Sequence, residues 1–438
     1  MRRMEGLPMA WRVRYQIVGL LTLGTMINYI DRVNISVAAP DIMHETGWDQ
    51  AQFGMVFSAF LVGYALFQFP GGMLADRWSA RNVLALSCVG FSLFTALTPL
   101  GQSTLLLLLS LRFLVGACES ASLPSLASLN ARWVPRQEFG RAQTLGLSGA
   151  ALGQMIAYPS TAWIIEYFSW EVVFYVNAAI GLLWMVLWLT YATNTPREHP
   201  KMTERELQEI DHGRIPMETP VAVSFRSILR SRAVLWLCAS YMLFGFIVWI
   251  FILWFPTYLV EARGLSRLQM GLVGMLPTGA SFLGIIAGGI VSDALVKRGW
   301  SVRSARSRFP GLCIGFSLPF LLGAVATPSI SLAIVLFVIF YFLLSLSVAG
   351  FWSLPLELNP HLVGAISGVM NMAGNCAGIF GPFTAGVLVA RTGDWTLPFH
   401  LVAALGVCCG LILFFFVAPT RMATAGASSA SSLRKVTE

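Results

Sequence analysis

The chain has 438 residues, of which 56% are hydrophobic and only 11% are charged, whereas soluble domains usually carry about a quarter charged residues. This composition excludes an ordinary soluble domain and predicts an all-α protein that crosses a membrane many times. The net charge of +8 does not indicate a nucleic-acid partner, because the basic residues are scattered over short loops instead of clustering on one face.

A membrane-spanning helix needs roughly 20 mostly apolar residues, and such runs recur along the whole chain. The first run contains Asp31 and Arg32, so we expect a retained first span and not a cleaved signal peptide. All seven cysteines fall in apolar runs, and we therefore expect neither disulfides nor a metal or other cofactor. The sequence predicts twelve spans, at about 15–39, 51–73, 82–100, 104–130, 141–166, 171–192, 233–260, 268–296, 309–327, 329–355, 361–390 and 396–418.

The lysines and arginines predict the orientation, because cytoplasmic loops are enriched in both. If both termini are cytoplasmic, 24 of the 29 basic residues fall on the inside. Only Arg263, Arg267 and Arg391 then lie in outer loops, and Arg32 and Arg112 lie within spans. We therefore expect a multi-pass protein of the inner or plasma membrane with cytoplasmic termini.

The spans divide into two halves around one long polar stretch. "GGMLADR" after the second span is echoed by "GGIVSDAL" after the eighth, which indicates an internal repeat. The polar stretch contains Thr203 and, three residues later, Glu206, a capping-box pattern that predicts a short surface helix. We predict four regions: a six-helix bundle at 1–192, a cytoplasmic linker with an amphipathic helix at 193–232, a second bundle at 233–420 and a disordered tail at 421–438.

Five motifs carry a resemblance to a known family. They are "GGMLADRWSAR", "YIDRVNISVAAP", "FLVGYALFQFPGG", "LRFLVGACESASLPS" and "LWFPTYL". The first is similar to the loop signature of the major facilitator superfamily, with Ser79 where a glycine is usual. Together the five resemble its anion:cation symporter family, which includes galactonate and glucarate permeases and sialin-like carriers. The resemblance implies two pseudo-symmetric six-helix bundles and transport of an organic anion.

Four charges are expected deep in the membrane, where each costs about 2.5–3.5 kcal/mol. Asp31 and Arg32 share a polar stripe with Asn28 on the first span, and Arg112 and Glu119 lie two turns apart on the fourth. Structural ion pairs are one interpretation. We prefer a functional one, because apolar residues would hold the helices together without the cost of desolvation.

The resemblance implies a role for each of these charges. Arg32 is similar to the residue that contacts the substrate's acid group, and Arg112 and Glu119 look like the charge relay of the family. Asp31 and Glu119 are then the proton-carrier candidates. We expect Glu119 to be linked to substrate binding and Asp31 to pair with Arg112.

Further polar residues are candidates for the substrate cavity or for gating. Helix–helix hydrogen bonding is the alternative role of the cavity candidates, and ordinary loop solvation that of the gating candidates. The candidates to line the cavity are Tyr29, Tyr64, Trp352, Ser353 and Asn371, and those expected to form gating ion pairs at cytoplasmic helix ends are Asp76, Arg77, Arg81 and Asp293.

The sequence thus predicts a monomeric transporter that imports an organic anion with a proton across the lipid bilayer. A sugar acid (aldonate, aldarate or hexuronate) is the preferred substrate, and an aromatic or dicarboxylic acid is the alternative. Sodium coupling and exchange remain open. An intramembrane enzyme is disfavoured because the chain contains no HExxH, P-loop or GxSxG motif. A sensor that binds without transport is the other alternative from a different class.

Overall fold

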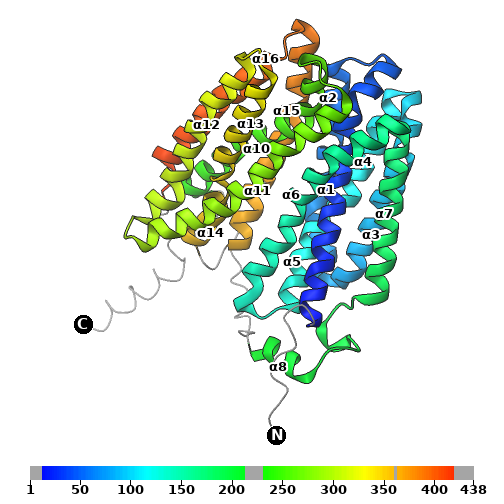
Figure 1. Cartoon of the computed structure of the whole chain (residues 1–438). Helices are drawn as coiled ribbons and strands as arrows, with labels where there is room; N and C mark the ends of the chain where they lie inside the picture. The colour runs from blue at the N-terminus through cyan, green and yellow to red at the C-terminus, as the bar shows by residue number, and fades with distance from the viewer. Residues whose placement is uncertain (1–11, 213–229, 360–362, 419–438) are drawn as a thin grey trace.

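The computed structural model describes residues 12–212, 230–359 and 363–418, and all of its regular structure there is helical. Figure 1 shows two groups of helices side by side, one built from the first part of the chain and the other from the second. The helices of the first group are α1 (Val13–Thr46), α2 (Gln50–Leu74), α3 (Ala80–Leu97), α4 (Leu105–Glu119), α5 (Ser122–Trp133), α6 (Arg136–Tyr167) and α7 (Trp170–Tyr191).

The second group follows the linker helix α8 (Glu204–His212). Its helices are α10 (Arg232–Thr257), α11 (Arg267–Lys297), α12 (Phe309–Ala326), α13 (Ile330–Ser345), α14 (Val348–Leu358), α15 (Val363–Thr392) and α16 (Thr396–Leu411). Short π-helical turns extend or join several of these helices, and 3-10 turns do the same elsewhere: η2 (Ala75–Ser79), η3 (Thr98–Ser103), η4 (Pro196–Glu198), η5 (Tyr258–Ala262), η6 (Ser304–Arg308) and η7 (Ile412–Phe416).

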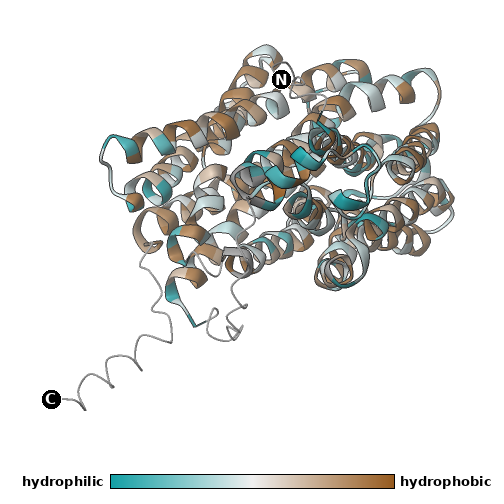
Figure 2. Ribbon diagram, turned by 90° about the horizontal axis from the view of Figure 1, so that it is seen from below, coloured by the Kyte–Doolittle hydropathy of each residue, from teal (hydrophilic) through white to brown (hydrophobic). Residues whose placement is uncertain are grey.

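The helices match the twelve predicted spans. Nine described stretches are long and apolar enough to cross a membrane, and one of them, Gln50–Ser103, contains both α2 and α3. The remaining two spans are α1 and α6, which carry more polar residues than the others. The α4–α5 and α13–α14 pairs each fill one predicted span. In Figure 2 the helices are largely brown, while teal segments concentrate at the face turned toward the viewer.

Local sequence signals set the helix ends. Asp49 and Gln52 form a capping box at the start of α2, and Ser266 and Gln269 form another at the start of α11. Gly47 ends α1 with a φ of 73°, a left-handed conformation that glycine adopts without a steric penalty. These ends fix where the chain turns back toward the membrane.

The linker is tied to the first group of helices through α8. Glu209 accepts hydrogen bonds from Arg12 at 2.5 Å and from Arg14 at 3.0 Å, and the hydroxyl of Thr203 accepts from the Glu206 N–H. Partial burial opposes ionisation, but the Arg14 hydrogen bond and the charge of Arg12 lower the pKa of Glu209 overall. Glu209 is therefore ionised at neutral pH and holds α8 against the start of α1, as seen at the bottom of Figure 1.

Glycines allow the helices around the buried charges to pack closely. A Cβ on Gly63 of α2 would lie 2.1 Å from the Phe113 carbonyl oxygen, and a Cβ on Gly116 of α4 would lie 2.0 Å from that of Phe60. Such close backbone approach is typical of small residues at membrane helix interfaces. The α2–α4 contact positions the two α4 charges described below.

Gly116→Val is therefore expected to destabilise the protein. Overpacking a close contact usually costs about 1–3 kcal/mol, and here the neighbour is backbone that cannot move aside. A lower Tm in detergent should be measured by tryptophan fluorescence or a thiol-reactive dye. Gly19→Ala is the control, because nothing lies within 4 Å of its Cβ position. Equal Tm values for both variants would contradict this packing.

Candidate functional site

Four buried charges meet inside the first group of helices. Asp31 and Arg32 come from the middle of α1, and Arg112 and Glu119 come from α4. All four side chains are at most 5% exposed. The 3.6-residue helical repeat places them on inward faces, so the sequence identified these positions, although not their partners.

Arg32 and Glu119 form a direct ion pair. The Arg32 Nε donates to Oε1 of Glu119, and the guanidinium lies 4.5 Å from the ring centroids of both Tyr29 and Tyr64. Among the described residues, Arg32 Nη2 and Glu119 Oε2 have no hydrogen-bond partner. The pair therefore keeps one free donor and one free acceptor, which a ligand or water can bind.

Asp31 has a different partner from the one expected. Its Oδ2 accepts a hydrogen bond from Thr95 of α3 at 2.9 Å, and no ion pair within 4.0 Å joins it to Arg112 in the described part of the chain. Arg112 lies over the Phe60 ring at 5.1 Å, with Nε and Nη1 unpartnered. Arg112 is still the charge that acts most strongly on Asp31, so the two interact across more than 4.0 Å here, and their direct pairing stays a prediction.

A central cavity lies beside these charges. It is small in the conformation described, with room for about one water, and is lined from both halves of the chain. Its polar lining consists of Tyr29, Arg32, Arg112 and Gln154, and the rest is aromatic or aliphatic, from Val33, Phe57, Phe60, Trp249, Ile252 and Leu253. A mostly apolar pocket with a few convergent polar groups is typical of a small-ligand site, and two arginines favour an anion.

The candidates in the second half of the chain do not line this cavity in the conformation described. The Ser353 hydroxyl donates to the Ala349 carbonyl of its own helix at 2.6 Å. Trp352 is 43% exposed and lies edge-on to Tyr241, and Asn371 is half-buried. Their predicted contact with substrate stays a prediction.

The predicted gating residues make contacts within their own halves. Arg81 donates to the carbonyls of Leu189 and Ala192, each at 2.5 Å, and Asp293 pairs with Arg306 at 2.6 Å. Arg77 is exposed. The side chain of Asp76 lies outside the part of the chain that the structure describes. Any gating role belongs to another conformation and stays a prediction.

Sequence reasoning missed ion pairs between the halves at the opposite end of the molecule. Arg267 at the start of α11 pairs with Asp41 near the end of α1 and lies 3.9 Å from Glu166 of α6. Gln50 also donates to Glu261 at 3.1 Å. These contacts close the end away from α8. The available signal was Arg267 itself, one of the few basic residues at a predicted outer helix end.

Comparison with known proteins identifies the family. The model for the Major Facilitator Superfamily matches residues 21–382, which is most of the chain. The chain belongs to the Major Facilitator Superfamily. It is therefore a multi-pass membrane transporter and not an enzyme, and the predicted family resemblance is confirmed at this level.

Curated relatives of this superfamily member carry organic anions according to their names. The chain is 35% identical to the probable sulfoacetate transporter of Cupriavidus necator, over 93% of this chain and 94% of the other. It is 32% identical to the probable galactarate/D-glucarate transporter of Bacillus subtilis, over 93% of each chain. It is also 33% identical to that organism's hexuronate transporter, over 92% and 94%.

Solved structures of the superfamily share the fold. A bacterial homologue of the human lysosomal transporter Spinster, inward-facing and unoccupied, superposes with a TM-score of 0.73 at 17% identity and covers 92% of this chain and 95% of its own. The inward-open xylose transporter of E. coli gives 0.71 at 16% identity, covering 95% and 99%. At this identity the likeness concerns the fold alone.

Proposed function

We propose that this transporter imports a sugar acid together with a proton by alternating access, with both termini in the cytoplasm. The substrate class is an aldonate, aldarate or hexuronate. The orientation rests on the excess of basic residues in the loops assigned to the inside. In that orientation, the end closed by Asp41 and Arg267 is the outer one, so the described conformation faces inward.

The observation that carries this proposal is the set of free donors beside the central cavity. Within the described ranges of the chain, Arg32 Nη2 and Arg112 Nε and Nη1 are buried without hydrogen-bond partners, and both side chains line a cavity to which both halves contribute. A carboxylate can accept two parallel hydrogen bonds from one guanidinium. Cavities between the halves are where transporters of this architecture place their substrates.

The Arg32–Glu119 pair supplies a way to couple the anion to a proton. A substrate carboxylate that binds Arg32 competes with Glu119 for the same cation, and a buried carboxylate that loses its cation partner favours the protonated form. Binding the anion and protonating Glu119 together leave the net charge of the site unchanged. The halves can then rock around the loaded site without placing an additional unpaired charge in the bilayer.

The names of the relatives support the sugar-acid class. Several relatives at 31–33% identity are named as transporters of galactarate, glucarate or hexuronate. Gln154 offers an amide to substrate hydroxyls inside the cavity. A second candidate is a short dianion or an aromatic acid. It is favoured by the aromatic residues of the lining, Phe57, Phe60 and Trp249, and by the sulfoacetate relative. A sensor would bind one of these acids without moving it.

A ligand panel tests the substrate class. The purified protein should be heated with D-glucarate, D-galactarate, D-gluconate, D-glucuronate, sulfoacetate, succinate and benzoate, with D-glucose as the neutral control. We expect a sugar acid to raise the Tm most and to compete with its own labelled form in proteoliposome uptake. A larger rise in Tm with sulfoacetate or benzoate would favour the second candidate over a sugar acid. Stabilisation without uptake would indicate a sensor.

A further inference from the structure

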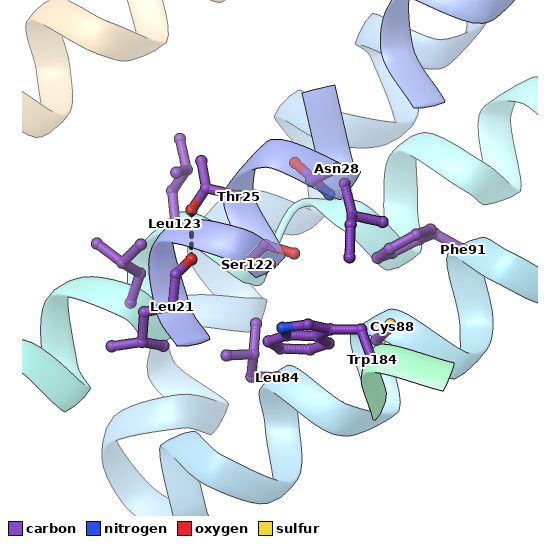
Figure 3. Close-up of a pocket in the computed structure, with 12 residues that line it drawn as sticks. Leu21, Thr25, Asn28, Leu84, Cys88, Phe91, Ser122, Leu123 and Trp184 are labelled. Carbon is purple, nitrogen blue, oxygen red and sulfur yellow. Dashed lines mark hydrogen bonds between the residues drawn. The ribbon is translucent and has the colours of Figure 1, made fainter. Parts of the chain in front are cut away.

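A second cavity lies within the first group of helices, apart from the central one. It has room for about one water and lies between α1, α3, α5 and α7. Figure 3 shows the Asn28 amide, the Ser122 hydroxyl and the Cys88 thiol around it, with the Trp184 ring across one side. None of its twelve lining residues lines the central cavity.

Asn28 is the unusual residue of this cavity. Its side chain is 2% exposed, and within the described residues neither its amide nitrogen nor its amide oxygen has a hydrogen-bond partner. Buried amides are almost always hydrogen-bonded, to ordered water when protein groups are absent. The lining is mostly apolar, and the Thr25, Ser122 and Cys88 groups already have protein partners. The two polar atoms of the Asn28 amide are therefore the groups that an internal water here would satisfy.

Polar groups continue from this cavity along one face of α5, and the first of them, the Ser122 hydroxyl, shares a hydrogen bond with Ser87 at 3.0 Å. Ser122, Ser125 and Trp133 are spaced by three and eight residues, which keeps them on the inner side of the helix. The Ser125 hydroxyl, the Asn130 amide oxygen and the Trp133 indole N–H are all buried without partners in the described chain. Together with Asn28 they define a polar track that runs toward the end of the bundle where α1 begins.

The other end of the polar track reaches Asp31. Asn28 and Asp31 are one helical turn apart on α1, and Thr95 of α3 donates to Asp31. The charged or titratable groups around Asp31 are Arg32 on its own helix, Arg112 and Glu119 on α4 and the Cys88 thiol on α3. Of these groups around Asp31, only the Cys88 thiol lines the second cavity. Asp31, one turn from Asn28, is therefore the one carboxylate that the track meets.

We propose that the polar track holds water and carries the coupled proton between Asp31 and the aqueous phase at the end where α1 begins, separately from the anion. In this step Glu119 gives its proton to Asp31, with which it interacts electrostatically. The Asp31 carboxyl O–H bond then breaks, and its proton forms a bond to an adjacent water, which passes on one of its own protons. The anion leaves through the central cavity, which the track does not enter. This inference rests on the proton symport proposed above.

The test compares net transport with exchange in proteoliposomes that contain the internal pH dye pyranine and use labelled D-glucarate. Asn28→Leu removes the polar group from the track. We expect proton-driven net uptake and the accompanying pH change to slow at least tenfold, whereas exchange at equal pH stays within about twofold. Asn28→Ser retains a hydroxyl and leaves more room for water, and it should restore net uptake to near the wild-type rate.

Gln154→Leu is the matched control, because Gln154 lines the central cavity and not the second one. It should raise the KM for D-glucarate in net uptake and exchange alike. The inference is overturned if Asn28→Leu and Asn28→Ser slow net uptake and exchange equally, or if Asn28→Leu leaves both unchanged. If the wild type moves D-glucarate without protons, the proposed coupling itself fails.

Discussion

Arg32→Ala is expected to abolish substrate binding and transport. The substitution removes the guanidinium that faces the central cavity and leaves Glu119 buried without its cation, which typically costs about 3–5 kcal/mol. Thermal-shift titration with D-glucarate should therefore show no stabilisation at concentrations that saturate the wild type. Radiolabelled uptake should fall to the level of empty liposomes.

Two controls separate loss of binding from loss of fold. The double variant Arg32→Ala/Glu119→Gln removes the uncompensated charge and should recover much of the Tm without recovering binding. Arg391→Ala removes an exposed arginine and should bind normally. Substrate binding by the double variant with wild-type affinity would show that Arg32 does not hold the acid group.

Glu119→Gln is expected to separate exchange from accumulation. The amide keeps nearly the same shape and can still accept from Arg32, but it cannot gain or lose a proton. Counterflow of labelled D-glucarate between equal pools should continue. Uphill accumulation driven by an inward proton gradient should be lost, because binding of the anion no longer requires a proton.

The comparison with Asp31→Asn assigns the proton to one of two carboxylates. Asp31 is not a member of the Arg32–Glu119 ion pair and accepts a hydrogen bond from Thr95, so its variant should slow net transport without uncoupling substrate binding from pH. Glu198→Gln, in the linker turn η4, is the surface control. If Glu119→Gln still accumulates substrate, then either Asp31 is the coupling carboxylate or a cation other than the proton drives transport.

The span pattern could be predicted from the sequence because long apolar runs separated by basic loops leave few alternatives in a bilayer. The breaks within spans could not. Residues 104–130 form one apolar run, yet the helix is interrupted between Glu119 and Ser122. A hydropathy average taken along the chain does not register such a break. The position of the break depends on packing with neighbouring helices.

The burial of the four charges could be predicted from the sequence, but their partners could not. Helical periodicity shows that Asp31 and Arg32 share a stripe, but it does not show how far α1 slides relative to α3 and α4. That offset brings Arg32 into an ion pair with Glu119 and places Asp31 within hydrogen-bond distance of Thr95. The contact between Asp41 and Arg267 joins residues 226 positions apart, so no local pattern could reveal it.

The most direct test of the whole account is a simultaneous recording of D-glucarate uptake and internal pH in wild-type proteoliposomes. If the buried charges bind the transported acid and its proton, the interior of the proteoliposome must acidify as the acid enters. A proton gradient alone must then drive accumulation. Accumulation that follows a sodium gradient at equal pH, with no acidification, would contradict the account.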